Sequence, residues 1–124
     1  MGYMKQFSKS YFDIVKLYGI VAIGAAGAPT ITNFPGVSSV TRTGVGAYDI
    51  VYTDTFSLFL MLSAVLEVAG PEALVVQVTA KNLSTKTISI LCVDTAGVVA
   101  DPSNGSVLRL EMTFSESSAY PNNG

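Results

Sequence analysis

The chain has 124 residues, of which 49% are hydrophobic and only 13% are charged, and its formal net charge is −2. This length fits one domain, and the negative net charge disfavours a nucleic-acid binder, because neutralising phosphates requires clustered Lys and Arg. A charged share well below the usual ~25% leaves apolar groups at the surface, so we expect the protein to form oligomers or to dock on a partner.

An amphipathic helix is predicted over residues 3–18. On a helical wheel of about 100° per residue, one arc carries five apolar side chains: Tyr3, Phe7, Tyr11, Ile14 and Tyr18. Three lysines and one aspartate fall on the opposite arc. Three interpretations stay open: a helix packed on its own domain, an arm that docks on a neighbouring subunit through the five apolar residues, and a membrane-surface helix, which is the least favoured. Three lysines are few for a membrane-surface helix.

From Gly19 onward, short apolar runs alternate with turn residues. We expect strands at 20–23, 37–42 and 47–53, the last two joined as a hairpin, and turns at 24–29 and 35–36. The apolar run at 56–68 is long enough for a strand or a helix. Its alternating leucines and its β neighbours favour a strand.

The clearest strands lie at 74–81, 87–92 and 107–115. In the last of these, Leu108, Leu110, Met112 and Phe114 alternate with polar residues, a pattern typical of a half-buried strand. Seven or eight strands with regular turns predict an all-β fold, an antiparallel sandwich or barrel. We therefore expect three regions: an N-terminal helical arm at 1–18, a β domain at 19–115 and a flexible tail at 116–124.

Residue types that carry catalysis or bind metals are scarce. There is no histidine and one cysteine, which excludes Ser-His-Asp and Cys-His arrangements and effectively excludes a zinc site. The acids are scattered singly, although sequence alone does not exclude two carboxylates that face one cleft. We expect no enzyme, no cofactor and no metal. At residues 101–105, Pro and Asn-Gly favour a turn over a calcium site.

Three core candidates lie in the predicted strands. Cys92 alternates with Ile88 and Ile90 and is expected to be buried. Tyr48 and Tyr52 share one strand face, which favours core or inter-subunit packing over an exposed aromatic binding strip.

Targeting signals are not evident. The apolar run at 56–68 is shorter than the ~18–20 residues of a membrane span, and charges interrupt residues 1–18, unlike a secretory signal. A lone cysteine cannot form an internal disulfide, which suits folding in a reducing cytoplasm. We expect no membrane partner.

Seven short segments, all of them turns or strand faces, carry a resemblance to known proteins. They are Tyr18-Gly19-Ile20-Val21, Gly27-Ala28-Pro29-Thr30, residues 36–42, Gly46-Ala47-Tyr48, Asp101-Pro102, Gly105-Ser106-Val107 and Ser117-Ser118-Ala119. Over residues 18–120 the chain resembles small virion proteins of tailed bacteriophages. The resemblance carries over no active site, and residues 1–17 lie outside it.

The resemblance implies a structural virion protein, such as a capsid cement (decoration) protein that stabilises the phage head. Such a protein would be made in the host cytoplasm, form a small oligomer, with a trimer expected, and bind the major capsid protein. The alternative is a tail or fibre component that binds a host receptor or glycan through loops at one end of the domain. Phe34 is one of the few aromatic residues in a predicted loop, and the chain has no Trp.

Overall fold

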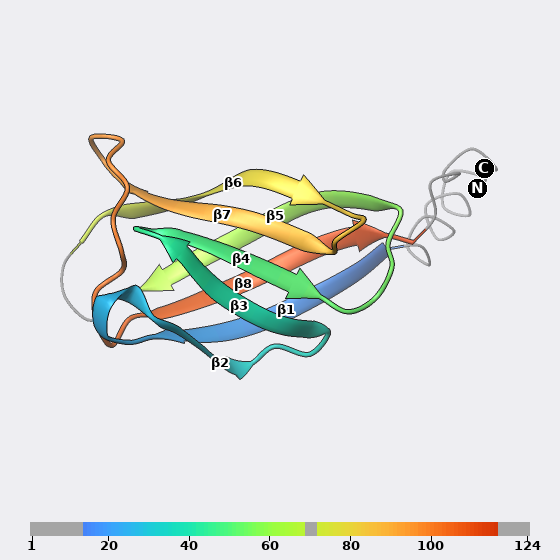
Figure 1. Cartoon of the computed structure of the whole chain (residues 1–124), viewed down its shortest axis with the longest axis horizontal. Coiled ribbons are helices and arrows are strands. Elements are labelled where there is room, and N and C mark those ends of the chain that lie inside the picture. Colours follow the sequence, from blue (N-terminus) through green and yellow to red (C-terminus); the bar gives the residue numbers. More distant parts are fainter. Residues whose placement is uncertain (1–13, 69–71, 117–124) are drawn as a thin grey trace, which may run out of the picture.

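The computed structural model describes residues 14–68 and 72–116. In chain order, the elements are β1 (Ile14–Ile23), the 3-10 turn η1 (Ala25–Gly27), β2 (Pro29–Asn33), β3 (Val37–Gly44), β4 (Ala47–Tyr52), β5 (Leu58–Glu67), β6 (Leu74–Asn82), β7 (Thr87–Asp94) and β8 (Val107–Ser115). They form two four-stranded antiparallel sheets, β2-β1-β8-β5 (the first sheet) and β3-β4-β7-β6 (the second sheet). The all-β prediction is confirmed, and the two open sheets form a sandwich and not a closed barrel (Figure 1).

Most predicted strands are present near their predicted bounds, including the ambiguous run that becomes β5. The strand that the sequence did not reveal is β2. It has five residues and begins at Pro29, with Ala28 between it and the turn η1. Proline lacks the N–H that a ladder needs, so it is tolerated at the first residue of an edge strand, which is where β2 lies.

The helix prediction is wrong for residues 14–18. They form the first half of β1, which pairs with β8 from Ile14 opposite Ser115 to Ala22 opposite Val107. Pairing with a strand about a hundred residues away supplies the hydrogen bonds, and Val15 and Leu17 pack against the core. The rest of the predicted helix, residues 3–13, lies outside the described residues, as does the tail from residue 117. Residues 14–18, which the prediction placed before the boundary at Gly19, therefore belong to the first sheet.

The core lies between the two sheets and follows the predicted alternation. Its fully or almost fully buried members are Val21, Ile23, Phe34, Tyr48, Ile50, Tyr52, Phe56, Ile88, Ile90, Cys92, Leu108, Leu110, Met112 and Phe114. At one end of the core, Phe114 stacks on Phe56 with ring centroids 4.4 Å apart. The ring centroids of Phe114 and Tyr52 lie 4.7 Å apart. Burying each large apolar side chain stabilises the fold by roughly 1.5–3 kcal/mol, so this shared interior holds the two sheets together.

Gly19 permits one close contact in this core. A Cβ at Gly19 would lie 2.1 Å from the ring of Phe34, which follows β2. Because glycine has no side chain there, the ring can lie directly on the β1 backbone. Phe34 is consequently buried, with only 4% of its surface exposed.

Candidate functional site

Exposed apolar side chains gather on one part of the molecule. Ten large hydrophobic residues are exposed in the described part of the chain, and seven of them lie on β1, β5 and β6: Tyr18, Leu58, Leu60, Met61, Val65, Val75 and Val78. The other three are Val45, Val98 and Val99, which lie in the turns and loops after β3 and β7. Monomeric proteins rarely expose large apolar patches, and such patches usually mark interaction sites.

The strand order explains where this patch lies. β5 ends the first sheet and β6 ends the second, and the two strands contact each other across the sandwich. Their free edges therefore open on the same side (Figure 1). We call this side, with Leu58, Leu60, Met61, Val65, Val75 and Val78, the open side. A long apolar edge strand is a template for pairing with another chain.

Each strand of the open side contains a register shift. In β5 the shift lies between Phe59 and Met61, where Leu60 has no partner on β8, and in β6 it lies between Val78 and Ala80.

The two strands carry only two charged residues, Glu67 at the end of β5 and Lys81 near the end of β6. Glu67 pairs with Arg109 on the neighbouring β8 at 2.6 Å. The nine β5 residues before Glu67 are uncharged, so β5 lacks the interrupting charges that usually protect edge strands.

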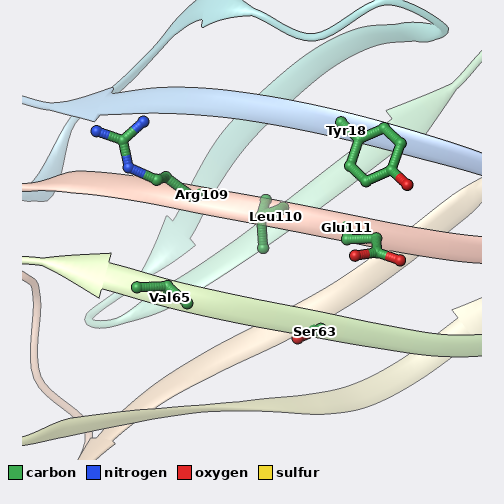
Figure 2. A pocket seen from close by; sticks show the side chains of 6 residues that line it. All are labelled: Tyr18, Ser63, Val65, Arg109, Leu110 and Glu111. Carbon is green, nitrogen blue, oxygen red and sulfur yellow. The ribbon is translucent and has the colours of Figure 1, made fainter.

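A shallow hollow adjoins the open side on the outer face of the first sheet. It has a volume of about 210 Å³ and is lined by Tyr18, Ser63, Val65, Arg109, Leu110 and Glu111. Figure 2 shows Tyr18 on β1, Glu111 on β8 and Ser63 on β5, one on each of three neighbouring strands. Tyr18 is 59% exposed. The hollow therefore presents an aromatic ring and a valine between charged groups.

The charges around this hollow pair with one another. Glu111 binds Lys16 at 3.2 Å, and Arg109 binds Glu67 at 2.6 Å. Among the described residues, Glu111 is the one carboxylate that lines the hollow, whereas acid–base hydrolysis of a glycosidic bond requires two. The exposed ring of Tyr18 and the paired charges make the hollow a candidate contact surface.

Asp101 holds the loops together at the Gly46 end of the sandwich. Its carboxylate accepts hydrogen bonds from Arg42 and from the backbone N–H of Gly46. The Arg42 guanidinium holds the pKa of Asp101 below its usual range, and the Gly46 N–H acts in the same direction. Nearby, the Tyr48 hydroxyl donates to the Gly27 carbonyl at 2.7 Å.

Within residues 14–68 and 72–116, no three His, Cys, Asp or Glu side chains lie close enough to hold a metal ion.

The remaining reactive side chain is in the core. Cys92 is completely buried, as predicted, and burial raises the pKa of its thiol to about 11. A thiol that stays protonated at neutral pH is a poor nucleophile. Tyr48 and Tyr52 are also buried, so they form core contacts and not an exposed aromatic strip.

The predicted partner-binding residues separate into two groups. Tyr3, Phe7 and Tyr11 lie outside the described residues. Ile14 and Tyr18 lie on β1, and Tyr18 lines the hollow beside the open side. The sequence did not identify the open side, since the run at 56–68 reads as a buried strand. The feature of the sequence that points to the open side is the absence of charged residues from residue 56 to residue 66.

Comparison of the chain with protein-family models, with curated proteins and with solved structures finds no match. Among the residues that the structure describes, no helix has the length and apolar character to cross a membrane.

Proposed function

We propose that the chain is a structural virion protein, a capsid cement (decoration) subunit that binds the phage head and associates with copies of itself. The observation that carries the proposal is the gathering of seven of the ten exposed large hydrophobic residues on β1, β5 and β6. Burying such a surface between subunits removes apolar area from water, which contributes about 25 cal/mol per Å² before the entropic cost of association is subtracted. The resemblance to small virion proteins supplies the class of partner, the major capsid protein.

The proposal includes no enzymatic activity. It is supported by a buried, protonated Cys92 and by a hollow whose charges are already paired. The tail or fibre alternative depends on exposed aromatic groups in the loops. Phe34, the loop aromatic that the sequence offered, is buried against Gly19. The head component is therefore the better supported of the two.

Binding to capsid shells tests the proposal. Purified protein is mixed with shells of the major capsid protein that lack this chain, and the bound fraction is measured by co-sedimentation. We expect saturable binding that Tyr18→Ser weakens several-fold, because Tyr18 is an exposed ring on the outer face. Val98→Ser is the control, since it removes another exposed apolar side chain from a different part of the fold. Failure of the wild-type chain to bind shells overturns the proposal.

A further inference from the structure

Three features of the open side bear on whether a second copy of the chain binds there: its main-chain edge, its apolar side chains and its charges. Antiparallel strands pair well when apolar residues on one face lie opposite each other. On the outward face of β5, Met61, Ser63 and Val65 occupy alternate positions, opposite Thr113, Glu111 and Arg109 of β8. If two β5 strands pair antiparallel about Ser63, Met61 of each copy lies opposite Val65 of the other.

Other registers fit less well. A shift of the centre by one residue toward Leu62 places Met61 opposite Ser63. The same shift toward Ala64 places Met61 opposite Glu67, and Glu67 is the one charged residue of β5. Of these three registers, the one centred on Ser63 places Met61 opposite Val65 in both symmetric positions. It also leaves the small side chain of Ser63 at the two-fold axis.

The charges favour a two-fold over a three-fold arrangement. The end of β5 and the beginning of β6 lie at the same end of the sandwich, so Glu67 and Lys81 lie toward opposite ends of the open side (Figure 1). A two-fold axis perpendicular to the sheets brings the Glu67 end of each copy to the Lys81 end of its partner. A three-fold axis along the strands would instead gather three copies of the Glu67–Arg109 pair and would lack the contact between Glu67 and Lys81 of a partner.

The size of the contact predicts weak association. Ten β5 residues at about 3.4 Å each give a length of about 34 Å, and two sheets about 10 Å apart with their side chains give a width of about 15 Å. Each copy then buries about 500 Å², or about 1,000 Å² for the pair, at the lower limit for a specific interface. In such a pair, β5 of one copy lies against β5 of the other, and β6 lies beside β6 of the other. Both free edges therefore gain a neighbouring strand.

We propose that two copies of the chain join through the open side, with their β5 strands antiparallel about a two-fold axis at Ser63. This inference rests on the proposed function, and it replaces the trimer that the resemblance implies with a two-fold pair.

Cross-linking at the proposed axis tests the contact in the full chain. Ser63→Cys places two thiols next to each other on the axis, so mild oxidation should give a covalent dimer. Thr41→Cys is the control, because Thr41 is exposed on β3, the end strand away from β6 in the second sheet. Cys92 is buried and does not compete. Equal cross-linking of the two variants overturns the inference.

Sedimentation of two further variants gives an independent measurement. Val65→Lys places a charge opposite Met61 of the partner and should abolish self-association, whereas Val45→Lys should not, since Val45 is also more than half exposed but lies in the β3–β4 turn. A wild-type chain that sediments as a 13.0 kDa monomer at every concentration also overturns the inference. Binding of such a monomer to capsid shells would leave the proposed function standing, so the two failures are distinguishable.

Discussion

Arg42 and Asp101 form a bidentate ion pair across one end of the sandwich. Arg42 Nε donates to Asp101 Oδ1 at 3.0 Å, and Nη2 donates to Oδ2 at 2.8 Å. Oδ1 also accepts the backbone N–H of Gly46 at 2.7 Å. Arg42 lies on β3 and Asp101 lies between β7 and β8, so the pair fastens the β3–β4 hairpin to the segment that leads into β8.

Replacing Asp101 by Asn should destabilise the fold. The substitution keeps the shape of the side chain but removes the charge that Arg42 and Gly46 bind. Hydrogen bonds to charged groups contribute about 1.5–3 kcal/mol, so we expect a loss of about 2 kcal/mol in urea unfolding. Asp54→Asn is the control, because Asp54 is exposed in the loop before β5 and its change should stay within about 0.5 kcal/mol. Equal effects of the two substitutions would contradict the role of Asp101.

The same carboxylate should make stability depend on acid. Arg42 lowers the pKa of Asp101 in the folded state, so its contribution is present above the unfolded carboxyl pKa of about 3.9 and is lost as the pH falls below it toward the folded value. We expect wild-type protein to lose more stability than Asp101→Asn between about pH 5 and pH 2. Parallel pH profiles of the two proteins would show that Asp101 is not responsible.

Tyr48 and Tyr52 should respond oppositely to removal of their hydroxyls. Tyr48→Phe leaves the Gly27 carbonyl without its buried donor, and we expect a loss of about 1–2 kcal/mol. The buried Tyr52 hydroxyl has no hydrogen-bond partner within the described residues, so Tyr52→Phe should leave stability unchanged or raise it. Thermal unfolding of both variants measures the difference, and a larger loss for Tyr52→Phe than for Tyr48→Phe would contradict these assignments.

Truncation distinguishes the strand at residues 14–18 from the helix that the sequence predicted. Deletion of residues 1–12 keeps all nine residue pairs between β1 and β8, whereas deletion of residues 1–18 removes five of the nine. The longer deletion also removes Val15 and Leu17 from the core. Circular dichroism should show a folded β protein after the shorter deletion and an unfolded chain after the longer one. A stable fold without residues 14–18 would contradict their place in the first sheet.

Local alternation made much of the fold predictable. Leu108, Leu110, Met112 and Phe114 face the core because a strand with one buried face has a period of two. Burial of Tyr48 and Cys92 follows from the same rule.

The error at β1 has a simple geometric cause. Residues four apart, such as Ile14 and Tyr18, share a face in both a helix and a strand. Lys16 distinguishes the two, since it lies opposite them on a helix but beside them on a strand. In the structure Lys16 pairs with Glu111 on the same outer face that carries Tyr18.

The candidate site was less predictable because it depends on strand order. The residues of β5 read as a buried strand, but β5 lies at the end of its sheet, and its outward face leaves Met61 and Val65 exposed. Strand order is set by pairing between distant segments, which hydrophobic period does not encode. Low charge predicted that an interaction surface exists but not where it lies.

Amide hydrogen exchange of the intact chain, in dilute and in concentrated solution, is the most direct test of the open side as the contact surface. Free edge strands exchange readily, and pairing with another copy protects them. We expect β5, and β6 beside it, to gain protection on concentration, while β2 and β3 on the opposite side stay unchanged. Protection confined to β2 and β3, or no change in any strand, would contradict an interaction through the open side.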